Sequence, residues 1–169
     1  EGLGWLNFLQ KFRFGGCLAD DMGLGKTVQV LAMLSNAKAK RKTSERRPTL
    51  IVMPRSLIYN WIAETKRFTK LKILDYSTPD RSASHLDDYD IVITTYAIMR
   101  RDIADLQAHS FFYAILDEAQ NIKNAQSQAS KAAKLINSEF KLCMTGTPVE
   151  NHLGELWSLF EFLNPGFLG

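Results

Sequence analysis

The stretch LADDMGLGKTVQ at residues 18–29 has the residue types and the spacing that bind a nucleotide phosphate. Gly23 and Gly25 let the backbone turn successive amide N–H groups inward, and a helix beginning near Lys26 adds the positive end of its dipole. In such a loop Lys26 reaches the β and γ phosphates, and the Thr27 hydroxyl binds Mg2+. The predicted binding segment consists of Asp21, Met22, Gly23, Leu24, Gly25, Lys26, Thr27 and Val28.

One position departs from the strict phosphate-loop pattern, which has a glycine where this chain has Asp20. A short polar side chain can also support the turn out of a strand at that point, so Asp20 does not exclude the assignment. The alternative is a glycine-rich turn that carries an incidental lysine.

A pair of adjacent carboxylates, Asp117 and Glu118, follows the most apolar run of the sequence, FFYAIL at 111–116. One carboxylate can hold the Mg2+ that Thr27 also contacts, and the other can orient and deprotonate an attacking water. Two acids can also simply mark the polar end of a strand. Together with GLGKT, however, the pair favours a site for a nucleoside triphosphate and Mg2+.

The segment TGTP at 145–148 is the third polar element. If its strand lies beside the strand that precedes the phosphate loop, Thr145 and Thr147 stand near the γ phosphate as hydroxyls that sense its presence. A capped turn, with Pro148 and Asn151 leading into the last helix, explains the same residues equally well.

Strands and helices alternate along the chain and would position these groups. Short runs rich in Ile, Leu and Val indicate strands buried on both faces, so we expect an α/β fold of three layers, a mainly parallel twisted sheet flanked by helices. The expected strands are GGCLA, TLIVM, KILDY, DIVIT, FFYAIL and KLCMT. The expected helices lie at about 5–12, 26–37, 56–68, 96–106, 126–136 and 152–163, with Ser56 capping the third and Leu153, Leu156, Trp157, Phe160 and Leu163 forming one apolar side of the last.

Polar residues follow the strands at five places, DDMGLGKT, PRS, TTY, DEAQ and TGTP. Ligands of an open parallel sheet bind outside the carboxyl ends of its strands, so these clusters should share one edge. The basic segment KAKRKTSERR at 38–47, with six basic residues and one acid in a chain of net charge +3, follows a helix and should lie at the opposite edge. A solvated connection explains it better than a nucleic-acid contact.

Size and composition are those of one globular domain over residues 1–169, with 46% apolar and 23% charged residues. No apolar run approaches the ~20 residues that cross a bilayer, and no export signal precedes the first helix, so we expect an intracellular protein without membrane contact. Cys17 and Cys143 sit inside apolar runs and fit no metal spacing, which favours reduced, buried thiols over a disulfide.

The motifs together resemble the first RecA-like lobe of the Swi/Snf-type DNA-dependent ATPases, within helicase-like superfamily two. GGCLADDMGLGKTVQ resembles motif I of that family, LIVMPRSLIYNW motif Ia, IVITTY motif Ib, ILDEAQNIKN motif II, and MTGTPVENHLGELWSLFEFLNPGFLG motif III with its extension. The resemblance covers the whole chain and implies ATP and Mg2+ as ligands and double-stranded DNA as partner.

The resemblance also implies a role for each matching residue. Lys26, Asp117 and Glu118 would be catalytic, with Thr27 and Asp117 as ligands of Mg2+. Gln120, Thr145 and Thr147 would link the nucleotide state to lobe movement. Contacts with the DNA backbone, independent of sequence, would come from Pro54, Arg55, Ser56, Thr94, Thr95 and Tyr96, although a helix cap and turn chemistry explain these six residues equally well.

Two elements of the family pattern lie outside residues 1–169. The glutamine motif that reads adenine would precede Glu1, and the second lobe, which supplies an arginine to the site, would follow Gly169. We therefore expect a monomeric fragment of a two-lobed protein that translocates on duplex DNA, and we expect the fragment alone to bind ATP weakly with little or no turnover.

Two other functions remain open at this point. The same lobe could serve an RNA or single-strand helicase, because the chemistry of Lys26, Asp117 and Glu118 would be identical. It could also be a binding module that uses a nucleotide as a switch and does not hydrolyse it. The compartment would be the cytoplasm or nucleoid in a prokaryote and the nucleus in a eukaryote.

Overall fold

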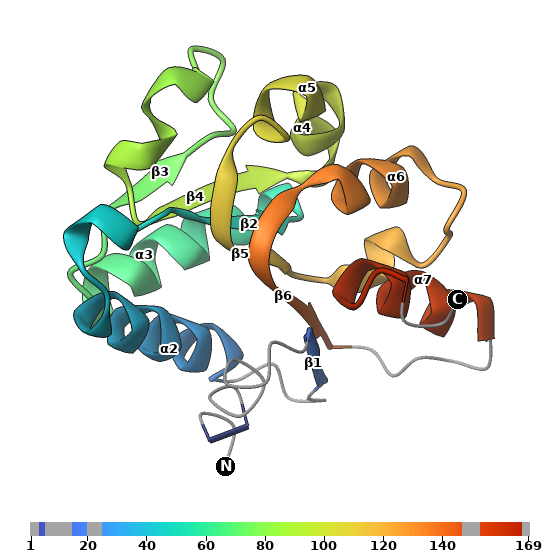
Figure 1. The fold of residues 1–169 in the computed structure, drawn as a ribbon, viewed down its shortest axis with the longest axis horizontal. Coiled ribbons are helices and arrows are strands. Elements are labelled where there is room, and N and C mark those ends of the chain that lie inside the picture. The colour runs from blue at the N-terminus through green and yellow to red at the C-terminus, as the bar shows by residue number, and fades with distance from the viewer. Residues whose placement is uncertain (1–3, 6–14, 20–24, 147–152, 167–169) are drawn as a thin grey trace.

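The chain forms a six-stranded parallel sheet between two layers of helices (Figure 1). This computed structural model describes residues 4–5, 15–19, 25–146 and 153–166. The strands lie in the order β1-β6-β5-β2-β4-β3, and every neighbouring pair is parallel. Their bounds are β1 Gly16–Ala19, β2 Thr49–Met53, β3 Ile73–Asp75, β4 Ile91–Thr95, β5 Ser110–Leu116 and β6 Asn137–Thr145. The predicted α/β fold is therefore confirmed.

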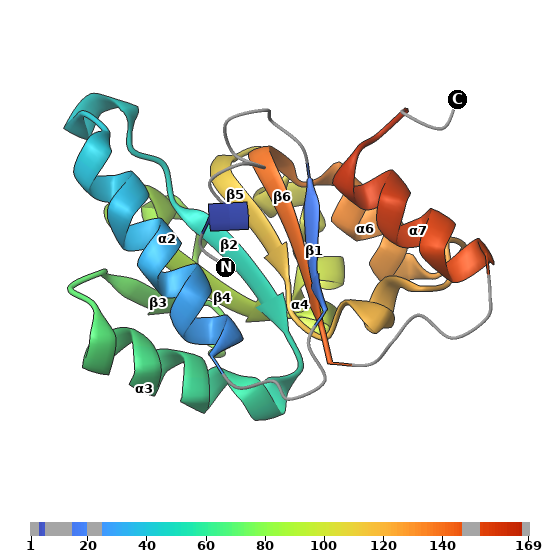
Figure 2. The same cartoon turned by 90° about the horizontal axis from the view of Figure 1, so that it is seen from below.

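Helices cover both faces of this sheet. The bounds of the helices are α2 Lys26–Lys40, α3 Ile58–Phe68, α4 Tyr96–Arg101, α5 Ile103–Leu106, α6 Gln128–Leu135 and α7 Leu153–Leu163, and the four short 3-10 helices are η1 Thr43–Glu45, η2 Arg55–Leu57, η3 Ala83–Asp88 and η4 Ala119–Ile122. Figure 2 shows α2 and α3 on one side of the sheet, with α6 and α7 on the other.

Alternate residues of β2 feed two separate cores, as a strand buried on both faces requires. Leu50 and Val52 pack with residues of α4 to α7, whereas Ile51 and Met53 pack with residues of α2 and α3. All five residues of β2 are buried. The continuous apolar run that predicted a strand therefore reflects two helical layers on one sheet.

The helix expected at 56–68 begins later and is capped differently. Residues Arg55–Leu57 form η2, Leu57 takes the N-cap position of α3, and no side chain caps that helix. The predicted cap at Ser56 is therefore wrong, because the 3-10 turn moves the start of α3 to Ile58 and leaves Ser56 exposed.

The helix expected at 96–106 is also interrupted. Asp102 has φ −100° and ψ 19°, which is not helical, and divides the segment into α4 and α5. Its carboxylate accepts a hydrogen bond from Arg81 Nε at 2.6 Å. The residue at the break, Asp102, thus forms an ion pair with Arg81 in the segment that follows β3.

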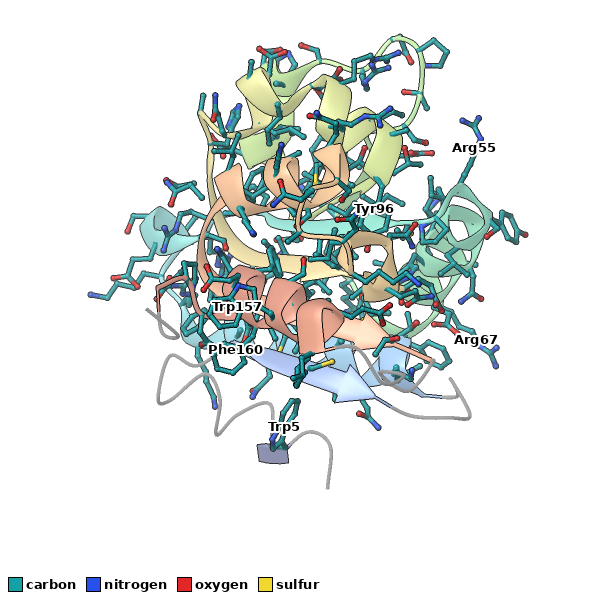
Figure 3. All side chains as sticks on the ribbon, turned by 90° about the vertical axis from the view of Figure 1, so that its right-hand side faces the viewer. Trp5, Arg55, Arg67, Tyr96, Trp157 and Phe160 are labelled. Atoms are coloured by element: carbon teal, nitrogen blue, oxygen red, sulfur yellow. The ribbon has the colours of Figure 1, made fainter. Side chains whose placement is uncertain are left out.

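The buried face of α7 differs from the predicted one. Leu153, Leu156 and Trp157 are 86%, 49% and 44% exposed, whereas Leu159 and Phe162 are buried. Ser158 is buried with them because its hydroxyl donates to the Ile122 carbonyl. A polar side chain with a partner can thus face the core, while part of the apolar side predicted from the sequence faces outward (Figure 3).

Phe162→Ala should therefore destabilise the chain much more than Trp157→Ala. Phe162 is 0% exposed, and removing its ring leaves a cavity that costs about 3–5 kcal/mol of unfolding free energy. Trp157→Ala should cost less than about 1 kcal/mol. Urea unfolding followed by circular dichroism measures both. Equal losses would contradict the orientation of α7.

The remaining sequence-based expectations have mixed outcomes. Cys17 and Cys143 are free thiols opposite each other in the β1–β6 register, and Cys143 is buried whereas Cys17 is only partly so. Trp5 and its neighbour lie in a short helical piece, but the rest of the opening helix falls outside the described residues. Within the part of the chain that the structure describes, every helix is too short or too polar to cross a bilayer.

Candidate active site at the carboxyl edge of the sheet

The carboxyl ends of the parallel strands bring the predicted polar clusters to one edge. β1 and β6 are neighbours with Ala19 opposite Thr145, so the strand before TGTP does lie beside the strand before the phosphate loop. β5, which leads to Asp117, is the next strand. Figure 2 shows α2 beginning at the same lower edge at which β6 ends. Phosphate-loop helix, acidic pair and Thr145 therefore meet there.

The first turn of α2 has features that favour the binding of an anion. Gly25 caps the helix with φ 87° and ψ −7°, a left-handed conformation that a glycine adopts without strain. No acidic side chain lies in the first turn of the helix. The first amide N–H groups of a helix have no partner inside it, so Lys26, Thr27 and Val28 present donors beside a positive dipole. Residues 20–24 of the predicted binding segment lie outside the described residues.

Lys26 points toward the acidic pair. Its side chain is buried, and Nζ donates to the Thr145 carbonyl at 2.8 Å. Glu118 Oε1 lies 3.9 Å and Lys26 Nζ 4.0 Å from the point where a Cβ on residue 146 would stand. Because position 146 is a glycine, the space between ammonium and carboxylate stays open.

Asp117 is a buried carboxylate with defined partners. Burial raises its pKa, while the Trp61 N–H, the Glu118 amide and the Lys26 charge act in the opposite direction. Trp61 Nε1 donates to Asp117 Oδ2 at 2.9 Å, and the Glu118 amide donates to Oδ1 at 2.8 Å. Lys26 Nζ and Glu118 Oε1 both lie beside residue 146, and the Glu118 amide donates to Asp117, so the ammonium and the two carboxylates share one part of the site.

Gln120 joins the acidic pair to β6. Its Nε2 donates to Glu118 Oε2 at 2.5 Å, and its Oε1 accepts from Thr145 Oγ1 at 3.1 Å. With the Lys26–Thr145 contact, a continuous chain of hydrogen bonds runs from the phosphate-loop helix to Glu118. Gln120 and Thr145 are therefore hydrogen-bonded to each other in this site, whereas their role in lobe movement stays a prediction and Thr147 lies outside the described residues.

The six residues predicted to contact DNA fall into two groups. Arg55 and Ser56 are exposed, Pro54 is half-buried, and Figure 3 shows Arg55 pointing away from the body of the protein. Thr94 is 0% exposed and donates to the Tyr76 carbonyl. Thr95 is buried and caps α4 by accepting from the Ile98 amide.

Tyr96 also lies inside the fold, where its hydroxyl donates to the Asp117 carbonyl at 2.7 Å. Burial raises its pKa well above the ordinary value, so the hydroxyl stays a neutral donor. The side chains of Thr94 and Tyr96 thus make internal hydrogen bonds, and contact of residues 94–96 with DNA stays a prediction. The capping role of Thr95 matches the alternative explanation for that residue.

Sequence reasoning missed two features of this site, the hydrogen bond of Trp61 and the backbone conformation of Glu118. Trp61 was noted only within the segment LIVMPRSLIYNW, although a buried tryptophan usually has an acceptor for its N–H. Glu118 has φ 51° and ψ 54° and is the one non-glycine residue with positive φ among those described. Nothing in its sequence neighbourhood indicates this conformation.

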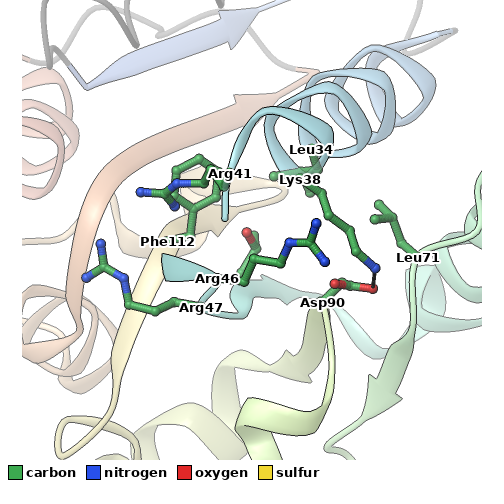
Figure 4. A pocket seen from close by; sticks show the side chains of 9 residues that line it. Leu34, Lys38, Arg41, Arg46, Arg47, Leu71, Asp90 and Phe112 are labelled. Carbon is green, nitrogen blue, oxygen red and sulfur yellow. Dashed lines mark hydrogen bonds and ion pairs between the residues drawn. The ribbon is translucent and has the colours of Figure 1, made fainter. Parts of the chain in front are cut away.

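Three of the six basic residues in the segment at the other end of the sheet form ion pairs with acidic residues elsewhere in the chain. Lys38 Nζ contacts Asp90 Oδ2 at 2.9 Å, and Arg41 and Arg47 share Glu139 Oε2 at 2.7 and 2.5 Å. Figure 4 shows the cavity of about 30 Å³ among these side chains, room for about one water molecule. The structure thus agrees with a solvated, ion-paired connection opposite the candidate site.

Comparison with known proteins gives one consistent family. A family model described as SNF2-related domain matches residues 1–169. The chain is 39% identical to the TATA-binding protein-associated factor BTAF1 of Arabidopsis thaliana and 40% identical to the putative ATP-dependent helicase/translocase YwqA of Bacillus subtilis. The matches cover 100% and 99% of this chain but only 9% and 19% of the two relatives.

A solved structure is similar over the same range. The SWI2/SNF2 ATPase core of Sulfolobus solfataricus in complex with dsDNA superimposes with a TM-score of 0.90 and 46% sequence identity. The match covers 99% of this chain and 35% of that chain.

Proposed function

The chain belongs to the SNF2-related domain family, and on that premise we propose that it is the ATP-binding lobe of a DNA-dependent ATPase that translocates on double-stranded DNA and displaces or remodels bound protein. The observation that carries the proposal is the convergence of Lys26 and Glu118 on Gly146 beside Asp117. The lobe would act with a second lobe of the same protein, since it matches only 35% of the ATPase core that it resembles.

The residues at the carboxyl edge fit a magnesium nucleotide. Lys26 has three N–H donors and gives one to Thr145, and each Asp117 oxygen keeps a lone pair beyond the hydrogen bond described for it. Thr27 and Asp117 would hold Mg2+, directly or through water, and the first turn of α2 would bind the phosphates. When bound, ATP would supply the γ-phosphoryl group, and Mg2+ would neutralise the charge that develops in its transfer.

The side chains divide the chemistry between them. Lys26 would bind the β and γ phosphates, and Glu118 would orient the attacking water and accept its proton. Gln120 holds Glu118 through Oε2, which leaves Oε1, the oxygen nearer Gly146, directed toward the open space. Gln120 and Thr145 would report the nucleotide state to the second lobe.

The DNA contact would use the exposed part of the rim. Arg55 and Ser56 stand in η2 directly after β2, where they could contact one phosphate backbone without reading bases. Such binding weakens as salt rises, because it releases counterions. The duplex substrate would also restrict the protein to the interior of the cell, and the lobe itself would be monomeric.

Stimulation of ATP turnover by different polymers tests this function. In the full-length protein, double-stranded DNA should raise turnover, whereas RNA of the same length should not. Stimulation by RNA alone would overturn the proposal in favour of an RNA helicase. The 169-residue chain, assayed beside it, should turn over at least about a thousandfold more slowly, because a trans-acting arginine is worth that factor in related phosphoryl transfers.

A further inference from the structure

Two aromatic side chains hold the acidic pair from the α3 and α4 segments. Trp61 is 1% exposed, and its indole N–H is directed at Asp117 Oδ2 over 2.9 Å. Asp117 itself is 8% exposed. The indole fixes the carboxylate by a hydrogen bond in a site largely closed to water, where such bonds to charged groups are strong.

Tyr96 holds the main chain of the same pair. Its hydroxyl donates to the Asp117 carbonyl at 2.7 Å and lies 3.5 Å from the Glu118 carbonyl. Between these two carbonyls the backbone of Glu118 adopts φ 51° and ψ 54°. A left-handed conformation of a non-glycine residue persists only when its surroundings impose it. The Tyr96 hydroxyl is one of the groups that contact this main chain from another segment.

Both donors lie in or directly after the two segments that the sequence predicted to contact DNA, residues 54–56 and 94–96. η2, which carries the exposed Arg55 and Ser56, runs directly into α3, which carries Trp61. Tyr96 is the first residue of α4 and follows Thr95, whose hydroxyl caps that helix. A displacement of either segment would therefore move a donor that bonds to Asp117.

We propose that Trp61 and Tyr96 are positioning residues that hold Asp117 and Glu118 in catalytic geometry and transmit the state of the DNA-contact segments to them. This inference rests on the proposed function. In this proposal neither Trp61 nor Tyr96 contacts the nucleotide. Asp117 keeps lone pairs for a metal because Trp61 uses one position of Oδ2 and the Glu118 amide one position of Oδ1.

Trp61→Phe and Tyr96→Phe in the full-length protein test the proposal. Each change removes a hydrogen-bond donor and keeps an aromatic ring. With saturating duplex DNA, kcat should fall about tenfold or more in Trp61→Phe, which loses a bond to a charged group, and about fivefold in Tyr96→Phe. The KM for ATP and the Kd for DNA should stay within about twofold. The double variant should lose less than the product of the two factors, since both bonds hold one dipeptide.

Tyr113→Phe is the matched control. Tyr113 is also buried, and it lies on β5, the strand that leads to Asp117, where its ring packs on Phe140. Loss of its hydroxyl should leave kcat within about twofold. Thermal unfolding should show that Tyr96→Phe and the control remain folded to the same temperature within a few degrees.

Two results would overturn the inference. One is an unchanged kcat in both variants. The other is a Kd for DNA that rises in proportion to the loss of turnover, which would mean that Tyr96 or Trp61 acts by binding DNA. If the unmodified protein hydrolyses ATP equally with and without DNA, the proposed DNA dependence fails, and the ratio of variant to unmodified kcat still decides the positioning role.

Discussion

Glu118→Gln in the full-length protein should lower DNA-stimulated ATP turnover by a factor of about 10² to 10⁴, the usual contribution of a general base. The amide keeps the size of the carboxylate but cannot accept a proton. Gln120 also holds Glu118 through Oε2, and the Asn121 side-chain amide donates to the Glu118 carbonyl, so the fold should tolerate the change. ATP binding should stay within about threefold, because Lys26 and Asp117 remain.

The control for this variant is Glu161→Gln, the same chemical change in α7 and away from the carboxyl edge. Its turnover should equal that of the unmodified protein. Steady-state ATPase assays and equilibrium binding of a slowly hydrolysed ATP analogue separate the two effects. If the unmodified protein binds ATP but shows no turnover for Glu118→Gln to abolish, the chain is a nucleotide switch and not a motor lobe.

Lys26→Ala should weaken binding of magnesium ATP by about tenfold to a hundredfold, the value of hydrogen bonds to a charged group. The variant removes the buried ammonium that contacts Thr145 and faces Glu118 across Gly146. Turnover at saturating ATP should also fall, because the same ammonium stabilises charge on the transferred phosphoryl group. Titration calorimetry and the ATPase assay measure the two losses.

Lys38→Ala is the matched control on the same helix. Lys38 lies at the far end of α2 and pairs with Asp90 at the opposite edge of the sheet, so ATP affinity should not change. An equal loss in both variants would show that basic charge in general, rather than Lys26 in this geometry, sets the affinity. An unchanged affinity in Lys26→Ala would remove the phosphate role from α2.

The sequence predicted which edge of the sheet carries the site, because that prediction needs only the direction of the strands and the polar residues that follow each strand. Apolar runs buried on both faces require a parallel sheet, and parallel strands bring Thr145 and Asp117 to the same edge without knowledge of any distance. The simplest strand order also predicted that β1 and β6 are adjacent. Their parallel pairing, with Ala19 opposite Thr145, confirms this prediction.

Prediction failed where the outcome depends on partners distant in sequence. Ser158 faces the core because the Ile122 carbonyl accepts a hydrogen bond from its hydroxyl, and no local sequence pattern indicates that acceptor. Tyr96 was predicted only to contact DNA, and no local pattern shows that its hydroxyl donates to the Asp117 carbonyl, 21 residues away. Trp61 and Asp117 are separated by 56 residues, so only the assembled sheet shows their contact.

The most direct test of the central claim is a labelling experiment with an acyl-phosphate derivative of ATP, which acylates lysines beside the bound phosphates. In the full-length protein with Mg2+, mass spectrometry should find the acyl group on Lys26, and excess ATP should suppress it. Asp117→Asn should weaken the labelling, because the carboxylate shares the magnesium nucleotide. Labelling of Lys38 or Lys40 without Lys26, or labelling of Lys26 that ATP does not suppress, would contradict a nucleotide site between the first turn of α2 and the acidic pair.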